Sequence, residues 1–327
     1  MGKMFINRGR KRAGSLVLAL LCLSALNGCM GKNETPAGKQ EPKEEVQAKA
    51  EANREQLAQA RSSMEERMLR FAEPTVEEVD WEAYFDGLNG AGVIYDPEQN
   101  LYQVYHPELA QTRRSPCSTF KIISSLIGLQ EGVIVPEGSV RTWSGETFWN
   151  EDWNQDIGFE DAFRTSCVWY FREVIDEIGA ERMQTALDSL AYGNCDISDW
   201  EGRLNTNNQN RALTGFWIES SLKISPKEQT EVMERIFGAH SEYSEEVQNR
   251  LKQVMRVEEA ADTDWLVYGK TGLGKTQGIT VDAWFTGFAE QEDRRVYFCI
   301  YLGRTDGANV TSTKAKEIAL QVIAGEA

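Results

Sequence analysis

The chain has 327 residues, of which 41% are hydrophobic and 26% are charged, so it can bury a sizeable core and is unlike a disordered polymer. Acidic residues outnumber basic ones by 51 to 35, a formal net charge of −16, which argues against a nucleic-acid partner because the phosphate backbone selects basic surfaces. Only two histidines and six cysteines are present, with no CxxC spacing. We therefore expect no metal site and no Ser-His-Asp triad.

The first 28 residues are typical of a secretory signal peptide. They hold five basic and no acidic residues, followed by an apolar run over 16–26 that is too short to span a bilayer. The run ends at Leu26-Asn27-Gly28-Cys29, which resembles a bacterial lipobox. We predict cleavage before Cys29, lipidation of that cysteine, and a lipid-anchored, extracytoplasmic protein attached to the cell membrane. An ordinary signal peptide, in which Cys29 is incidental, is the alternative.

Residues 29–75 are predicted to form a polar tether. They are rich in Lys, Glu, Gln and Ala and contain few large apolar residues. Residues 44–70 include good helix formers, but their apolar positions make no sustained heptad. A coiled coil or a partner helix is the alternative to a tether. The globular domain is predicted over 76–327.

Within this domain, a hairpin is predicted first, with strands over 91–96 and 101–105. Apolar residues at three- and four-residue spacing then predict helices over 118–130, 159–178, 181–190 and 225–237. Aromatic and β-branched residues predict strands over 265–269, 283–289 and 296–302, before a closing helix over 313–323. This order predicts an α+β fold in which helices flank an antiparallel sheet built from both ends of the domain, with an inserted helical subdomain.

The first chemical motif is Ser118-Thr119-Phe120-Lys121, an SxxK pattern. On a helix this spacing places the hydroxyl and the amine on one face. Pro116 indicates a helix start, where unpaired N–H groups favour developing negative charge. Ser118 is thus a candidate nucleophile. Its base would be Lys121, whose amine must be desolvated or chemically altered because a free lysine is protonated at neutral pH. An N-cap serine followed by a surface lysine also fits the pattern.

Three further motifs follow, with 48, 26 and 78 residues between successive first members. They are Ser166-Cys167-Val168, Tyr192-Gly193-Asn194 and Lys270-Thr271-Gly272. The ammonium and hydroxyl of the last motif can hold a carboxylate, and its glycine lets a substrate approach the backbone. Each motif alone would fit a cap or a turn, but their order together indicates a serine-based site.

With these motifs in this order, the sequence resembles the penicillin-recognising serine enzymes. It resembles most specifically the class D β-lactamases (oxacillinases) and the similar sensor ectodomains of β-lactam receptors, through the segments CSTFK, SCVWYF, YGN, FWIESSLKISPKEQ and YGKTG. The resemblance runs from about Val76 to the C-terminus. It implies a β-lactamase/transpeptidase-like fold and hydrolysis of β-lactam antibiotics through a serine acyl-enzyme. A non-hydrolysing sensor-like module and a DD-peptidase are the alternatives.

The resemblance also implies roles for residues around the serine. Ser118 would be acylated, and Lys121 would be carboxylated by carbon dioxide or bicarbonate to N6-carboxylysine, the general base, with no other cofactor. Trp217 would donate its indole N–H to the carbamate, in an apolar environment lined by Val168 and Ile218.

Substrate-facing roles are implied in the same way. Ser166 would relay a proton to the β-lactam nitrogen, and Lys270, Thr271 and Gly272 would border the substrate. The oxyanion hole would use the backbone N–H groups of the nucleophile and of Leu273.

One departure from the class D pattern concerns the substrate carboxylate. Many class D enzymes carry an arginine near the start of the last helix, which this sequence lacks. The carboxylate partner could then be Thr271, Lys270, or a nearby Arg304 or Lys314, and the sequence does not separate the last two.

A second departure is the long stretch between Asn194 and Trp217. The insertion, residues 195–215, has no assigned role and could reshape the rim of the site. It contains the sequence WEGRLN, which matches the ExxLN pattern of class A β-lactamases and offers Glu201 as an alternative base.

The cysteines near the motifs favour a structural interpretation. Cys117 and Cys167 adjoin the two motif serines, which raises the possibility of redox-active thiols, but burial as small packing residues is favoured. Cys195 and Cys299 have no partner that the sequence can assign. The sequence leaves open the β-lactam spectrum and the oligomeric state.

Overall fold

The computed structural model describes residue 55 and residues 73–204, 209–258, 264–305 and 310–326. The chain divides into two compact units, Met1–Glu65 and Glu66–Ala327. The predicted signal peptide, Cys29 and most of the predicted tether lie outside the described residues and stay predictions. No helix in the described ranges is both long and apolar enough to cross a membrane.

The described part of the second unit contains a six-stranded sheet in the order β1-β3-β2-β6-β5-β4. The strands are β1 Thr75–Glu78, β2 Gly90–Asp96, β3 Leu101–Tyr105, β4 Leu266–Thr276, β5 Ile279–Gln291 and β6 Arg294–Gly303. Pairing of β2 with β6 joins the N-terminal hairpin to the C-terminal strands, which confirms a sheet built from both ends of the domain. All pairs are antiparallel except β1 with β3, an edge pairing that the sequence did not predict.

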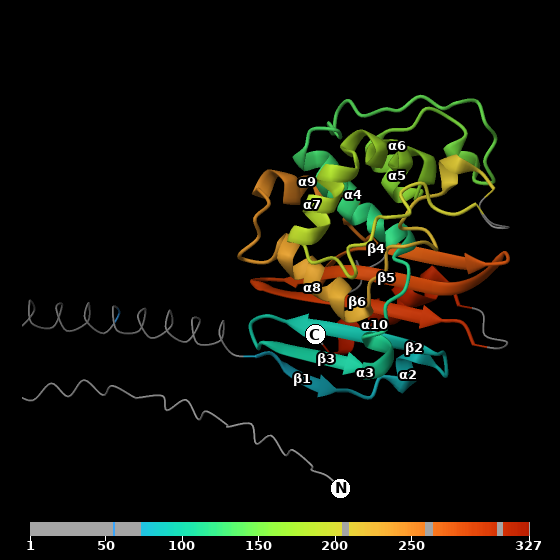
Figure 1. The fold of residues 1–327 in the computed structure, drawn as a ribbon. Helices are drawn as coiled ribbons and strands as arrows, with labels where there is room; N and C mark the ends of the chain where they lie inside the picture. Colours follow the sequence, from blue (N-terminus) through green and yellow to red (C-terminus); the bar gives the residue numbers. More distant parts are fainter. Residues whose placement is uncertain (1–54, 56–72, 205–208, 259–263, 306–309, 327) are drawn as a thin grey trace, which may run out of the picture. The chain divides into compact units, whose positions relative to one another are not determined.

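Helices occupy both faces of this sheet (Figure 1). The α-helices are α2 Glu82–Phe85, α3 Pro107–Ala110, α4 Lys121–Gln130, α5 Phe159–Arg164, α6 Val168–Ile178, α7 Ala180–Ser189, α8 Pro226–Phe237, α9 Glu245–Met255 and α10 Ser312–Glu326. The short 3-10 helices are η1 Cys117–Phe120, η2 Glu151–Trp153 and η3 Arg211–Leu213. The predicted helical subdomain is inserted between β3 and β4. Helix α9 was not predicted; only its Leu251 and Met255 are buried.

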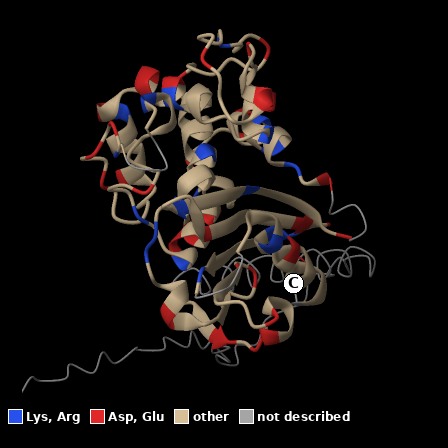
Figure 2. Ribbon diagram, turned by 90° about the vertical axis from the view of Figure 1, so that its right-hand side faces the viewer, with Lys and Arg blue, Asp and Glu red and all other residues tan. Residues whose placement is uncertain are grey.

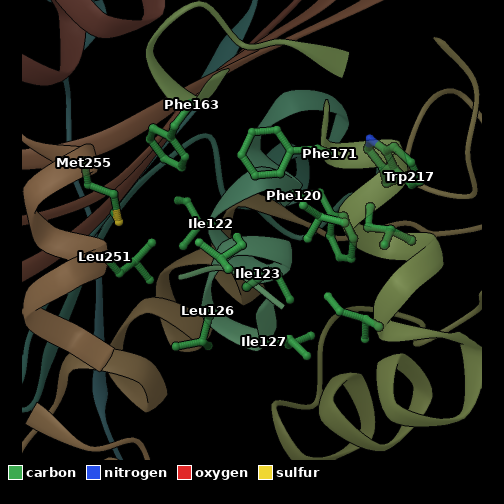
Figure 3. Close-up of a cluster of buried hydrophobic side chains, with 14 of the residues drawn as sticks. Phe120, Ile122, Ile123, Leu126, Ile127, Phe163, Phe171, Trp217, Leu251 and Met255 are labelled. Carbon is green, nitrogen blue, oxygen red and sulfur yellow. The ribbon is translucent and has the colours of Figure 1, made fainter. Parts of the chain in front are cut away.

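Two hydrophobic cores lie on opposite faces of the sheet. On one face α2 and α10 pack against Val267, Phe285 and Phe298. On the other face the helical subdomain and α8 form a larger core in which α4 is central. Figure 3 shows the α4 side chains between those of α9 and of Phe171 on α6. The segment that begins with the SxxK motif is therefore held by the largest core of the domain.

The single helix predicted over 159–178 is two helices in the structure. Helix α5 ends at Arg164 and α6 begins at Val168. Between them Ser166 adopts a left-handed conformation with φ of 60°, and the Cys167 N–H donates to the Ala162 carbonyl at 2.8 Å. The apolar spacing continues across this turn, so periodicity alone does not reveal it. The break places Ser166 on a turn.

The segment Ser225-Pro226-Lys227-Glu228 begins α8 with a capping box. The Ser225 hydroxyl accepts from the Glu228 N–H, and the Glu228 carboxylate accepts from the Ser225 N–H. Pro226 occupies the first helical turn, where its missing N–H has no cost. This part of the class D-like motif is therefore explained by helix capping.

We expect Ser225→Ala to lower the free energy of unfolding by about 1 kcal/mol, because the Glu228 N–H in the first turn of α8 loses its acceptor, the Ser225 hydroxyl. Ser225→Gly is the matched control and should cost only a few tenths of a kcal/mol, since glycine is tolerated at an N-cap. Urea denaturation followed by circular dichroism measures both. Equal stability of the alanine variant and the wild type would contradict the capping role.

Candidate active site

Ser118 lies in η1, immediately before α4, so the expected helix-start position is confirmed. The Lys121 amine donates a hydrogen bond to the Ser118 hydroxyl, with Nζ and Oγ 3.0 Å apart. The turn is fixed from its other side, because the Thr119 hydroxyl donates to the Pro116 carbonyl at 2.7 Å and accepts from the Gln229 amide at 2.9 Å. The hydroxyl of Ser118 is thus presented to the amine by a rigid turn.

Lys121 is buried, with 1% of its surface exposed. Its amine lies 5.5 Å from the centroid of the Phe171 ring. Burial lowers the pKa of Lys121 to about 8, while the nearby thiols of Cys167 and Cys117 act in the opposite direction. About a tenth of the amine is therefore neutral at pH 7, far more than for a free lysine, and this fraction can accept a proton or react as a nucleophile.

Trp217 lies beside the nucleophile turn. Its carbonyl accepts from the Cys117 N–H at 3.0 Å, and its ring stacks on Phe120 with 6.0 Å between centroids. Trp217 is 1% exposed, whereas Val168 and Ile218 are half-buried and pack against the same core. The structure thus gathers these three predicted residues on the helical core that buries Lys121.

Ser166 reaches the same region from the turn between α5 and α6. Its Oγ is buried and has no hydrogen-bond partner. The next residue, Cys167, is close enough to Lys121 to affect the pKa of the amine. Burial of a polar group without a hydrogen-bond partner costs free energy. The Ser166 hydroxyl is therefore suited to form a hydrogen bond with a further group bound in the site.

Lys270 and Thr271 lie within β4, which extends to Thr276 and so is longer than the predicted strand. The Lys270 amine donates to the Thr271 hydroxyl at 3.2 Å and is 5% exposed. Burial, reinforced by the positive charges of Lys121 and Lys316, lowers the pKa of Lys270 to about 7. The two motif lysines are therefore brought close enough to influence each other.

Gly272 allows β4 to run directly beside η1. A Cβ at this position would lie 2.9 Å from the Thr119 methyl and 3.0 Å from the Pro116 carbonyl oxygen. The glycine is needed for close approach of two backbones, and its φ is not in the left-handed region. Leu273, which follows, is 36% exposed. The segments of Ser118 and Leu273 therefore face each other across a short distance.

The Tyr192-Gly193-Asn194 motif has a structural position. The Asn194 side chain accepts from the Lys223 N–H at 2.8 Å and donates to the Ser221 carbonyl at 2.9 Å. A Cβ on Gly193 would lie 2.0 Å from the Lys223 carbonyl oxygen. This motif thus holds the stretch that follows Trp217, which agrees with its interpretation as a turn.

The class A-like alternative finds little support in the structure. The Glu201 carboxylate is 66% exposed and pairs with Arg172 at 3.5 Å, whereas Lys121 holds the hydrogen bond to Ser118. Asn205, the last residue of that pattern, lies outside the described residues.

Two other cations were predicted as possible partners of the substrate carboxylate. Arg304 is exposed after β6, and the Lys314 amine lies 3.8 Å from Glu317.

The described cysteines are all free of disulfides: Cys117, Cys167, Cys195 and Cys299. Burial raises the pKa of Cys117 to about 12 and that of Cys167 to about 11. Both thiols are therefore protonated at neutral pH, which supports packing over redox chemistry. Within the described ranges, no group of three or more His, Cys, Asp or Glu side chains is placed to hold a metal ion.

The sequence analysis missed three residues that matter to the site. Phe171 and Phe163 lie against the amines of Lys121 and Lys270, and Arg172 anchors the inserted stretch. Phe163 carries only the signal of a helical apolar face, Phe171 belongs to the SCVWYF segment but was given no role there, and Arg172 looks like an ordinary surface residue in the sequence.

Comparison with known proteins identifies the family. The family model described as "Penicillin binding protein transpeptidase domain" matches residues 90–324. The "Probable beta-lactamase YbxI" of Bacillus subtilis (strain 168) is 32% identical over 265 residues, which cover 81% of this chain and 89% of that protein. The chain belongs to the penicillin-binding protein transpeptidase-domain family, in the class D β-lactamase branch.

Solved structures agree with this membership of the class D branch. A class D β-lactamase from Bacillus subtilis matches with a TM-score of 0.63 and 32% identity, covering 75% of this chain and 94% of that one. The C-terminal domain of the Bacillus licheniformis BlaR penicillin-receptor matches with a TM-score of 0.66 and 28% identity, covering 77% and 97%. In sequence, "Regulatory protein BlaR1" of Bacillus licheniformis is 28% identical over 250 residues, and the match covers 76% of this chain but 39% of the receptor's length.

We expect Lys121→Met to weaken the rise of stability with pH, leaving the part that Lys270, whose pKa is also lowered by burial, contributes. In the wild type the buried amine loses its proton near pH 8, whereas in the unfolded chain it does so near 10.5, so the unfolded chain binds more protons in this window and stability increases with pH. The advantage of the wild type over the variant should grow by about 3 kcal/mol between these two pH values. Urea denaturation in carbon dioxide-free buffers measures it. Parallel pH profiles would contradict the burial of a titrating amine.

Proposed function

We propose that the protein hydrolyses β-lactam antibiotics through a serine acyl-enzyme formed on Ser118. The observation that carries the proposal is the fully buried Lys121 amine, which donates to the Ser118 hydroxyl at 3.0 Å. A serine becomes nucleophilic when an adjacent base removes its proton, and a buried lysine of lowered pKa is such a base or its precursor. Membership of the class D branch supports the same chemistry.

We further propose that Lys121 carries a carbamate formed with carbon dioxide. The residues fit such a group, because the amine is buried and partly neutral and the Ser166 hydroxyl is buried without a partner. The Ser166 hydroxyl and the indole N–H of Trp217 would hold it. When present, the carbamate supplies a general base for acylation and for deacylation. Phe171 and Trp217 exclude water from around Lys121.

Other residues of the chain bind and orient the substrate in this proposal. Lys270 and Thr271 hold the carboxylate of the antibiotic, because their ammonium and hydroxyl lie together on β4. The backbone N–H groups of Ser118 and Leu273 stabilise the oxyanion from the two facing segments. Ser166 passes a proton toward the β-lactam nitrogen.

A non-hydrolysing β-lactam sensor is the second candidate, and it is favoured by the match to the BlaR penicillin-receptor domain. A sensor and a lactamase share the acylation step and differ in whether the acyl-enzyme is hydrolysed. A DD-peptidase, which releases D-alanine from cell-wall peptide, is the third candidate. The rate of deacylation therefore separates the lactamase from the sensor, and release of D-alanine identifies the peptidase.

The test uses the purified full chain with the chromogenic β-lactam nitrocefin. We expect many turnovers, loss of activity at low pH in degassed buffer, and recovery when bicarbonate is added, because the base would be rebuilt from carbon dioxide. With ¹³C-bicarbonate, NMR should show a carbamate signal that is absent from Lys121→Ala. Ser118→Ala should form no acyl adduct, and Glu201→Gln, a change to an exposed side chain, should keep full activity.

Each contrary result selects another function. A single burst with a stable acyl adduct by mass spectrometry would establish the sensor. Release of D-alanine from a cell-wall peptide without turnover of nitrocefin would favour the peptidase. Activity that bicarbonate does not restore, combined with an inactive Glu201→Gln, would replace the carbamate by a class A-like base.

We also propose that the protein is exported and anchored by a lipid on Cys29, a residue outside the described part of the chain. The basic start, the short apolar run and the lipobox-like sequence support this proposal. Cys29→Ala should move the protein out of the membrane fraction and abolish incorporation of labelled palmitate in a bacterial host. Undiminished labelling of this variant would disprove the anchor.

A further inference from the structure

Arg172 occupies a position that the reaction proposed above does not use. It lies on α6, six residues after Ser166, and its side chain is only 8% exposed. A guanidinium is almost never buried without partners, because each of its N–H groups must be satisfied. Its partners therefore indicate what the residue does.

The partners of Arg172 come from its own helix and from the inserted stretch. The guanidinium makes two bonds to the Asp176 carboxylate, with Nε–Oδ2 and Nη2–Oδ1 distances of 3.0 and 2.7 Å. Nη1 donates to the Trp200 carbonyl at 2.9 Å and more weakly to the Thr214 carbonyl at 3.4 Å. The Glu201 carboxylate lies 3.5 Å away. One side chain thus joins α6 to both described ends of the insertion.

Trp200 continues these contacts toward the site. Its indole N–H donates to Asp176 at 3.2 Å, and its ring stacks on Phe216 with 5.1 Å between centroids and an angle of 27° between planes. Phe216 meets Trp217 and Phe120 edge-on at 5.2 and 5.3 Å. Figure 3 shows Trp217, Phe120 and Phe171 gathered in one cluster of buried side chains. An unbroken series of contacts therefore leads from Arg172 to Phe120, the residue directly before Lys121.

Two glycines leave the described ends of the inserted stretch little freedom to shift. A Cβ on Gly202 would lie 2.3 Å from the Gly215 nitrogen, and a Cβ on Gly215 would lie 2.0 Å from the Trp217 ring. The Thr214 hydroxyl donates to the Glu201 carbonyl at 2.8 Å. The two described ends of the stretch thus contact each other, and Trp217 packs directly against Gly215.

We propose that Arg172 and Asp176 are a positioning pair that fixes the inserted stretch on α6 and so holds Trp217 against the nucleophile turn. Arginine suits this role because its planar fork binds a carboxylate with two bonds and still reaches two carbonyls, which a lysine cannot do. The effect of this pair on the Lys121 carbamate rests on the proposed function. Its effect on the position of Trp217 is independent of that function.

The experiment compares Arg172→Met with Arg203→Met, using the full chain. Arg203 is the matched control because it lies in the same stretch but is 68% exposed and pairs only locally, with Asp199 at 3.1 Å. Hydrogen exchange should become faster in Arg172→Met for peptides covering Cys117 and residues 214–222, whose amide hydrogen bonds include that to the Trp217 carbonyl. In Arg172→Met, hydrogen exchange in β5 and β6 should remain as in the wild type. In Arg203→Met, hydrogen exchange should remain as in the wild type throughout the chain.

A second measurement follows the site itself. The bicarbonate concentration needed for half-maximal activity should rise about tenfold in Arg172→Met, because a loosened Trp217 holds the carbamate less well, while kcat at saturating bicarbonate stays near the wild-type value. A purely structural role would leave this concentration unchanged. Arg172→Lys should fall short of full rescue because it cannot replace the fork.

The outcomes separate the two proposals. Unchanged exchange around Trp217 together with an unchanged bicarbonate requirement overturns the positioning role. If the activity of the wild-type protein does not depend on bicarbonate, the carbamate is refuted, and hydrogen exchange alone then decides the role of Arg172. If Arg172→Met fails to fold, Asp176→Asn, which keeps the size of the side chain, must show the same two changes, and its wild-type behaviour would overturn the proposal.

Discussion

The burial of one amine beside one hydroxyl is the constraint on which the site depends. Lys121 can act on Ser118 only if its proton is easily lost, and this requires a dry environment on every side. The large core of the helical subdomain supplies that environment, since α4 passes through its centre, Phe171 lies against the amine, and Trp217 stacks on the neighbouring Phe120. The helical insertion is therefore part of the chemistry as well as of the fold.

The sheet supplies the other half of the site. Because β2 pairs with β6, strands from both ends of the domain form one platform, and β4 at its edge passes beside η1. Gly272 sets the distance between strand and turn. Figure 2 shows charged residues mostly along the helices and loops, whereas the strands are mostly drawn in the colour of other residues, and Asp96 is the one acidic residue that is buried in the described part of the chain. The acidity of the chain is thus a property of its surface, and the cations of the site are buried beneath it.

Local patterns in the sequence predicted a large part of this arrangement. The SxxK spacing predicted the contact of Ser118 and Lys121. Two strand-like runs predicted the hairpin, and aromatic and β-branched residues predicted the C-terminal strands. Periodicity could not reveal the turn at Ser166, because the apolar pattern runs through it and the left-handed φ leaves no mark on spacing. The stacking of Trp200 on Phe216 joins residues that only the folded chain brings together, so the anchoring role of Arg172 was also hidden.

The two buried lysines give the proposed carbamate a further consequence. As ammonium ions, Lys121 and Lys270 repel each other, and the charge of Lys121 adds to burial in lowering the pKa of Lys270. Conversion of Lys121 to a carbamate would reverse the sign of one partner, and the repelling pair would become an attracting pair. Lys270 would then regain the positive charge that an anionic substrate requires. A single uncharged gas molecule would thereby prepare the base and the anion receptor in the same event.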